Sequence, residues 1–171
     1  AYLWPPGDPR VQTILHAEEV YSSEWNFAIM PRRDSSFSDI VRVALDRTKS
    51  GRQTHVIFID LLDRVREVRE AQQREKAAVI KRLLIEGSEL AQRIGGHVCF
   101  LAQISRGGVT QTSDGRPTME WIRDSGGWEE VCDNVWLLHR PDPSVLVVII
   151  GKQKNGPCGD NVVVRLPFNG A

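Results

Sequence analysis

The chain has 171 residues and no net charge, with 22 lysines and arginines against 22 aspartates and glutamates. This length suits one domain with a hydrophobic core, and the balanced charge leaves room for a nucleic-acid partner only through a local basic patch. The three cysteines show no paired spacing, so we expect a reducing, cytoplasmic location. No apolar run reaches the roughly 20 residues that span a bilayer, and the first residues do not resemble a signal peptide. We therefore expect no membrane contact.

The first third of the chain predicts a helix, a strand and a second helix. Residues 11–20 are expected to form a short helix, and residues 25–29 a strand. A longer helix is expected from Phe37 to Ser50, because its apolar side chains recur at helical spacing. The serine pair at 35–36 supplies an N-cap for this helix, and Gly51 ends it.

Two short apolar runs predict neighbouring strands of a parallel sheet. Residues 55–59 read HVIFI and end on Asp60, and residues 97–102 read HVCFLA and end on Gln103. Continuous apolar runs of this length are typical of strands that are buried on both faces of a parallel sheet.

A long charged helix is expected between these strands, from Glu67 to Ile94, with Gly95 and Gly96 closing it. One stripe of this helix is apolar and includes Gly87, where the missing side chain would let the helix approach the sheet closely.

The second half predicts a long loop followed by a β-rich end. Residues 104–118 are rich in Gly, Ser, Thr and Asp, and a helical segment is expected near residues 128–131. A third strand is expected at 134–138, followed by a terminal antiparallel hairpin with strands at 145–151 and 162–166. The sum is a single α/β domain with strand–helix–strand units and a β-rich end.

Polar residues at strand ends are the first candidates for a functional site. Ligands of open α/β sheets bind at the carboxyl ends of the strands, which is where Asp60 and Gln103 lie, although an aspartate in this place often only caps the next turn. Lys152 and Lys154 are two residues apart at a strand end, so both ammonium groups should leave the same face. They either solubilise a strand edge or reach for an anion. The four histidines do not cluster, which disfavours a zinc site.

Four motifs in a fixed order carry a resemblance to a known family. They are HVIFID at 55–60, LAQISR at 101–106, DGRP followed by IRDSGGWEEVCD at 114–133, and IIGKQKNGPCG at 149–159. Together they resemble the ATPase domain of DnaB-type replicative helicases, whose RecA-like fold forms hexameric rings around single-stranded DNA. The resemblance implies a RecA-like parallel sheet flanked by helices, with a C-terminal antiparallel hairpin.

The resemblance also implies a nucleotide site for ATP and Mg²⁺. Asp60 matches the acid of the Walker B strand, which holds Mg²⁺ through water, and Gln103 matches the γ-phosphate sensor. Lys152 and Lys154 match the basic pair that one protomer projects into its neighbour's site, where it meets charge on the γ-phosphate.

Three further residues match family positions that face the central channel and contact DNA: Arg123, Asp124 and Gly126. The expected partners are therefore single-stranded DNA, five further copies of the full-length protein in a homo-hexamer, and a helicase loader or primase.

This sequence departs from the family pattern in three places. Lys154 stands where the family has arginine, which loses the planar fork that grips phosphate. Leu61-Leu62-Asp63 follows Asp60 in place of Tyr-Leu-Gln. No G-x-x-x-x-G-K-[ST] motif occurs, so the phosphate loop is missing, together with the glutamate that follows it in the family. The central strand that carries this loop should leave a vacant slot in the sheet.

Two explanations of this absence are open. Either residues 1–171 are the C-terminal portion of a RecA-like helicase ATPase domain, inactive alone but part of an ATP-dependent helicase, or the chain is a truncated, non-hydrolysing module for ring assembly or for partner or DNA binding. A recombinase or circadian-clock type of RecA-like ATPase is a third possibility, which the R-D-S-G-G and K-x-K-N-G-P segments disfavour.

Overall fold

A computed structural model describes residues 30, 35–104, 115–122, 125–159 and 162–167 of the chain. The chain divides into two units, Ala1–Arg33 and Asp34–Ala171, and the elements described below all belong to the second. The helix predicted at 11–20, the strand predicted at 25–29 and most of the loop predicted at 104–118 lie outside the described residues. Among the described residues no helix is long and apolar enough to cross a membrane.

Helix α2 spans Phe37–Lys49 and begins at a capping box, as its sequence predicts. The Ser36 hydroxyl accepts a hydrogen bond from the Asp39 backbone N–H, and the Asp39 carboxylate accepts one from the Ser36 N–H, both at 3.2 Å. The helix ends at Ser50, and Gly51 follows with a φ of 79°. Because Phe37 and Ala44 are buried, one face of α2 contributes to the core.

The first sheet consists of β1 (Val56–Ile59) and β2 (His97–Phe100), which run parallel. In their register Val56 lies opposite His97, and Ile59 lies opposite Phe100. The prediction of two adjacent parallel strands is therefore confirmed.

The single long helix predicted from Glu67 to Ile94 is wrong. The structure has a short helix α3 (Arg66–Glu70) after the 3-10 turn η1 (Leu62–Arg64), and then a separate helix α4 (Lys76–Ile94). The chain between them holds only one apolar residue, Ala71, whose backbone is extended. A continuous helix would place this polar stretch beside the core, where it has no apolar side chains to bury. The helix therefore ends at Glu70, and a new helix begins at Lys76.

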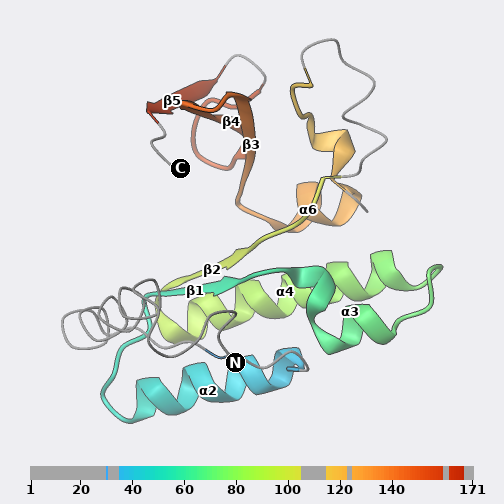
Figure 1. Cartoon of the computed structure of the whole chain (residues 1–171). Helices are drawn as coiled ribbons and strands as arrows, with labels where there is room; N and C mark the ends of the chain where they lie inside the picture. Colours follow the sequence, from blue (N-terminus) through green and yellow to red (C-terminus); the bar gives the residue numbers. More distant parts are fainter. Residues whose placement is uncertain (1–29, 31–34, 105–114, 123–124, 160–161, 168–171) are drawn as a thin grey trace, which may run out of the picture. The chain divides into compact units, whose positions relative to one another are not determined.

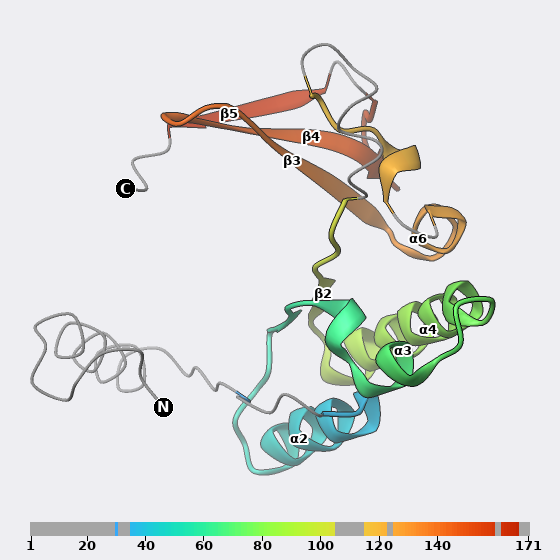
Figure 2. The ribbon, with the colours of Figure 1, turned by 45° about the vertical axis from the view of Figure 1, so that its right-hand side comes forward.

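The apolar stripe of α4 is confirmed, and it packs against β2. Its buried residues are Ile80, Leu83, Leu84, Gly87, Leu90 and Ile94, and Gly95 ends the helix in the left-handed conformation with a φ of 63°. An ideal Cβ on Gly87 would stand 2.6 Å from Cε2 of Phe100, so only glycine allows this approach. Figures 1 and 2 both show α4 lying along the β1–β2 pair.

The prediction that β1 is buried on both faces is also wrong. Ile59 is buried, but Phe58 is 68% exposed and Val56 is exposed as well. The described sheet has only two strands, and no described element covers the face that carries Val56 and Phe58. A parallel sheet with an exposed face is unusual. The vacant slot expected beside these strands stays a prediction, because residues 1–29 lie outside the described part of the chain.

The second sheet is antiparallel and has the order β3-β4-β5 (Figure 2). It is formed by β3 (Asn134–Asp142), β4 (Val145–Gln153) and β5 (Val163–Pro167). The predicted terminal hairpin is confirmed as β4 and β5. The strand predicted at 134–138 is longer than expected and pairs with β4 through a tight turn, in which Asp142 accepts a hydrogen bond from the Ser144 backbone N–H.

The two faces of this second sheet differ in burial. One face belongs to the core and carries Val135, Leu137, Val147 and Ile149. The other face exposes four apolar side chains, Trp136, Leu138, Val164 and Leu166, with Trp136 at 64%. Strand alternation explains this pattern, since Trp136 lies opposite Ile150, and Leu138 opposite Val148.

Helix α6 (Ser125–Val131) joins the elements around α4 to β3. Trp128 is only 5% exposed, and its ring meets Phe100 edge-on with centroids 6.4 Å apart. Lys81 of α4 forms an ion pair with Glu130 at 2.6 Å. The short helix predicted near residues 128–131 is therefore present, and it packs directly on α4 and β2.

Candidate nucleotide-binding site

Asp60 and Gln103 leave the same end of the first sheet. Asp60 follows the last residue of β1, and Gln103 lies three residues after the last residue of β2. The two chains remain hydrogen-bonded beyond the strands, because the Leu101 N–H donates to the Ile59 carbonyl and the Leu62 N–H donates to the Leu101 carbonyl, both at 3.0 Å. The carboxylate and the amide therefore lie at the carboxyl ends of two adjacent parallel strands, where open α/β sheets bind their ligands.

Both side chains are exposed and available to a ligand. Within the described part of the chain, neither the Asp60 carboxylate nor the Gln103 amide takes part in a hydrogen bond or an ion pair. The alternative role of Asp60 as a cap of the following turn has no support, since η1 has no side-chain cap. An exposed acid without a protein partner suits contact with a hydrated cation.

The residues present fit Mg²⁺ only as a cation held through water. The described residues contain no group of three His, Cys, Asp or Glu side chains that could enclose a metal ion. Asp60 is thus a single carboxylate at the sheet edge. Mg²⁺ commonly keeps several waters and takes one or two carboxylates plus the phosphates of its substrate, so this donor set fits a Mg²⁺–nucleotide complex and not a metal site built from protein alone.

Lys152 and Lys154 both contact the segment Glu129–Asp133, which comprises the end of α6 and the two residues that lead into β3. Lys152 lies in β4, and its ammonium group donates to the Glu129 backbone carbonyl. Lys154 follows the end of β4, and its Nζ lies 2.8 Å from Oδ1 of Asp133. The Lys154 backbone N–H also donates to the Asp133 carbonyl at 2.9 Å. The two ammonium groups have different partners, Glu129 and Asp133, and their common face stays a prediction.

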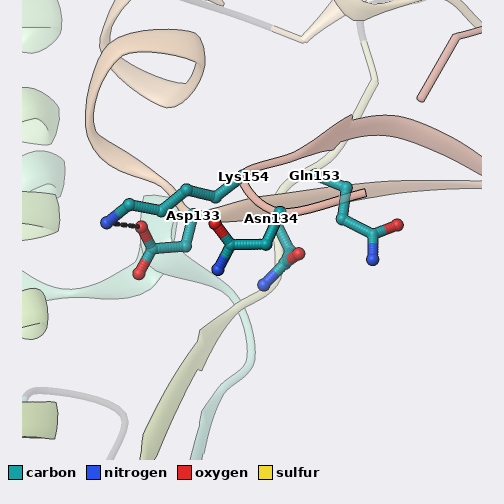
Figure 3. Close-up of a pocket in the computed structure, with 5 residues that line it drawn as sticks. Asp133, Asn134, Gln153 and Lys154 are labelled. Atoms are coloured by element: carbon teal, nitrogen blue, oxygen red, sulfur yellow. Dashed lines mark ion pairs between the residues drawn. The ribbon is translucent and has the colours of Figure 1, made fainter. Parts of the chain in front are cut away.

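Lys154 and Asp133 belong to an open polar pocket of about 340 Å³ at the end of the second sheet (Figure 3). Asn134, Gln153 and Asn155 complete its lining. The Asp133 carboxylate raises the pKa of Lys154, first by accepting its hydrogen bond and then by its charge. Lys154 is therefore fully charged at neutral pH, and its side chain remains 67% exposed.

Sequence reasoning missed Asp133. It stands as the last residue of a family-like motif, but its contact with Lys154 depends on the pairing of β3 with β4. The signal that could have found it is a charge complement, since an acid that starts one strand of a hairpin faces a base that ends the other.

The predicted DNA-contacting residues are described only in part. Arg123 and Asp124 lie outside the described residues. Gly126 lies in α6, is exposed, and has nothing within 4 Å of the position that a Cβ would take. The contact of Gly126 with DNA stays a prediction.

The cysteines offer no nucleophile beside these residues. Burial raises the pKa of the Cys132 thiol to about 11, although the charge of Lys152 opposes the shift. Burial also raises the pKa of Cys99. All three cysteines are free thiols, and Cys158 is exposed.

Comparison with known proteins decides the family. The model of the DnaB-like helicase C-terminal domain matches residues 10–170. The chain belongs to this family. The DnaB-like assignment made from the four motifs is thereby confirmed, together with the RecA-like ATPase fold that the solved structures share.

Relatives among characterised proteins are replicative helicases. The chain is 32% identical over 130 residues to the replicative DNA helicase DnaC of Bacillus subtilis, covering 70% of this chain and 28% of that protein. It is 32% identical over 139 residues to the replicative DNA helicase DnaB of Geobacillus stearothermophilus, covering 75% and 29%. The DnaB-like chain described here thus spans less than a third of the length of these relatives.

Two solved structures share its fold. One is an ATPase domain that superposes with a TM-score of 0.77 at 23% identity, covering 95% of this chain and 58% of that one. The other, a DnaB-like replicative helicase solved in a study of its interactions with primase, gives a TM-score of 0.75 at 23% identity, covering 95% and 40%.

Proposed function

We propose that this DnaB-like chain forms part of an ATP-dependent, ring-shaped helicase that unwinds DNA at replication. In this proposal the full-length protein is a homo-hexamer around single-stranded DNA. The 171 residues supply the Walker B acid, the γ-phosphate sensor, the DNA loop and the trans-acting lysines, and they are inactive alone. Membership of a family whose relatives are replicative helicases supports the class of activity.

The observation that carries the proposal is the placement of Asp60 and Gln103. They follow adjacent parallel strands at one sheet edge, and both are exposed and unengaged by other described residues. Mg²⁺ supplies neutralising charge to the β- and γ-phosphate oxygens when it is bound with ATP. Asp60 would orient its water shell, and the Gln103 amide would hydrogen-bond the γ-phosphate or the attacking water, and so register its loss.

Lys154 and Lys152 would act on a neighbouring subunit's nucleotide. Both stand at the end of β4, and Lys154 is largely exposed, which suits a contact outside its own subunit. Positive charge placed where negative charge develops lowers the barrier to phosphoryl transfer. Lysine acts as a point charge, so we expect a smaller rate gain than the roughly 10³–10⁵-fold that an arginine finger gives.

The DNA contact is assigned to Arg123, Asp124 and Gly126. An arginine and open backbone N–H groups suit phosphate contacts, which position a strand without reading its sequence. Gly126 lies at the start of α6, and the loop predicted at 104–118 comes between Gln103 and this helix in the sequence. A sensor at one end of this loop and a DNA contact at the other would couple hydrolysis to translocation. A helicase loader or a primase is the expected protein partner, in keeping with the primase interaction of the similar DnaB-like helicase.

The test is DNA-stimulated ATPase activity and unwinding by the full-length protein. Asp60→Asn removes the charge that orients the metal's water shell, and it should abolish both activities. Asp46→Asn is the matched control, because Asp46 is an exposed residue of helix α2 and does not lie at a strand end, and it should retain both activities. Wild-type turnover in Asp60→Asn would reject the assignment.

A second candidate function is a non-hydrolysing module for ring assembly or for partner or DNA binding. It is favoured by Lys154, which stands where the family has arginine, and by the exposed apolar face around Trp136 and Leu138. Calorimetric titration of the 171-residue chain with Mg-ATP should give no tight binding under either function. The full-length protein separates them, because only the helicase hydrolyses ATP. Tight binding by the chain alone would show that it has a phosphate cradle of its own.

A further inference from the structure

One short segment, Glu129–Asp133, holds both lysines of the proposed finger. Its first carbonyl accepts the Lys152 ammonium group. Its last residue holds Lys154 twice, with the backbone carbonyl at 2.9 Å from the Lys154 N and the carboxylate at 2.8 Å from Nζ. Figure 3 shows the Lys154 side chain directed along the pocket to Asp133. The position of both ammonium groups therefore depends on where this segment lies.

The segment is itself braced against the rest of the domain. Trp128 is buried edge-on against Phe100, the last residue of β2, which is also the strand that leads to Gln103. Glu130 forms its ion pair with Lys81 of α4. An ideal Cβ on Gly127 would lie 3.3 Å from Cβ of Lys81, so the α6 backbone approaches α4 closely. These contacts leave the end of α6 little freedom to move independently of α4 and β2.

We infer that Asp133 is the positioning residue for Lys154, and that the segment Glu129–Asp133 at the end of α6 positions both lysines. This inference rests on the proposed function, in which Lys154 acts on a neighbour's nucleotide. A lysine side chain has four rotatable bonds, and an exposed one samples many rotamers unless a partner selects among them. The carboxylate of Asp133 selects those that lie along the pocket, and its carbonyl holds the turn that presents the side chain.

The contact with Asp133 leaves Lys154 able to act. An ammonium group has three donors, so it can keep one hydrogen bond to Asp133 while it donates to a phosphate oxygen. The partner of Lys152 is a neutral carbonyl, which leaves its charge uncompensated. The two lysines thus differ in their partners: Lys154 is held in one direction by a carboxylate, and Lys152 has no neutralising carboxylate in this contact.

Helix α6 also connects Lys152 and Lys154 to the predicted DNA-contacting residues. Helix α6 begins at Ser125, directly after the predicted DNA-contacting residues 123–124, and both lysine anchors lie at or beyond its other end. One braced helix therefore links the predicted DNA contact to the segment that holds both lysines.

The test combines a structural readout on this chain with steady-state kinetics on the full-length helicase. In the 171-residue chain, nuclear magnetic resonance titration of the lysine side chains should show the pKa of Lys154 falling toward its ordinary value in Asp133→Asn. In the full-length protein, Asp133→Asn should lower the DNA-stimulated kcat by about three- to tenfold with little change in KM for ATP, because the mispositioned group acts mainly in the transition state. Asp133→Glu, which keeps the carboxylate, should recover part of this loss.

Two further variants show whether Asp133 acts through Lys154. Asp133→Asn combined with Lys154→Ala should be no slower than Lys154→Ala alone, since the positioned group is already gone. Asp142→Asn is the matched control, because Asp142 is the last residue of β3, at the other end of the strand from Asp133, and its carboxylate accepts a hydrogen bond from Ser144, and this variant should keep the wild-type kcat.

The outcomes separate the inference from the function on which it rests. Wild-type kcat in Asp133→Asn together with a clear loss in Lys154→Ala would overturn the positioning role and leave the finger intact. Wild-type kcat in Lys154→Ala would instead reject the finger itself. Additive losses in the double variant would assign Asp133 a role independent of Lys154, again against the inference.

Discussion

Gly87 is the position where an added side chain should lower the stability of the fold most clearly. It lies in α4 against β2, and an ideal Cβ would stand 2.6 Å from Cε2 of Phe100, where ordinary contacts begin at 3.4 Å. The ring would have to move by more than about 0.8 Å even for alanine, because its Cζ lies closer still. Gly87→Val adds two more methyl groups on the same side.

The ring of Phe100 is partly buried and has an aromatic neighbour on two sides. It stacks on Phe37 with centroids 6.1 Å apart and meets Trp128 edge-on at 6.4 Å. Each aromatic pair is worth about 0.5–1.5 kcal/mol beyond its buried area, and forcing extra methyl groups into a packed core costs about 1–3 kcal/mol. Valine is better than glycine in a helix by about 0.4 kcal/mol, which offsets little of this. We therefore expect Gly87→Val to lower the free energy of unfolding by about 2–4 kcal/mol.

Thermal and urea denaturation followed by circular dichroism measure this change. For a chain of this size, about 2–4 °C of Tm is lost per kcal/mol, so the Tm should fall by roughly 5–15 °C. Ser88→Val is the matched control, because Ser88 is the next residue of α4 and is exposed, and its Tm should stay close to that of the wild type. An unchanged midpoint in Gly87→Val would refute the close packing of α4 on β2.

The remaining predictions concern the cap of α2, the thiols and the mass of the chain. Ser36→Ala should lower the free energy of unfolding by about 0.5–2 kcal/mol through loss of the N-cap. The control Ser88→Ala should be neutral or slightly stabilising. Equal effects of the two substitutions in urea denaturation would show that the capping box does not stabilise the fold. The hydrogen bonds from Ser36 hold the pKa of Asp39 below its usual value, so the stabilisation is present above pH 3.8 and is lost as the pH falls through the lower, folded value. In Ser36→Ala this acid-dependent loss should shrink, and an unaltered pH profile of unfolding would contradict it. Iodoacetamide at about pH 8 should modify exposed Cys158 first and Cys132 last, because a thiol with a pKa of about 11 is almost wholly protonated at that pH. Early labelling of Cys132 in mass spectrometry would show that this thiol is accessible to solvent. Light scattering should give the mass of a single chain for the 171 residues, since they supply only part of the proposed ring site, and a hexamer would contradict that expectation.

Local signals in the sequence predicted what local contacts decide. The serine before Phe37 and the glycine after Ser50 mark the ends of α2, and the apolar periodicity of α4 identifies its buried stripe, because capping and amphipathic burial depend on residues a few positions apart. The common edge of Asp60 and Gln103 could likewise be predicted, since two apolar runs linked by a helix form adjacent parallel strands whose carboxyl ends coincide.

Contacts between distant segments decided the rest. The break at Ala71 is invisible to helix propensity, because it arises from the absence of anything to bury along a polar stretch. The exposure of Phe58 depends on which neighbours the sheet has, and the run HVIFI is the same with or without them. The partner of Lys154 depends on the β3–β4 register, which shifts between Val135 and Trp136. Sequence spacing holds no information about such a shift.

Mixed rings of the full-length protein test the central claim most directly, namely that one subunit's lysines serve its neighbour's nucleotide. Asp60→Asn and Lys154→Ala subunits are each expected to have low ATPase activity alone. In rings assembled from a one-to-one mixture, about a quarter of the interfaces would join an intact Asp60 to an intact Lys154 across the subunit boundary. The account predicts that DNA-stimulated ATPase activity rises in the mixture toward this fraction of the wild-type rate. Activity no higher than the mean of the two variants would contradict it, because a site built within one subunit cannot be restored by mixing.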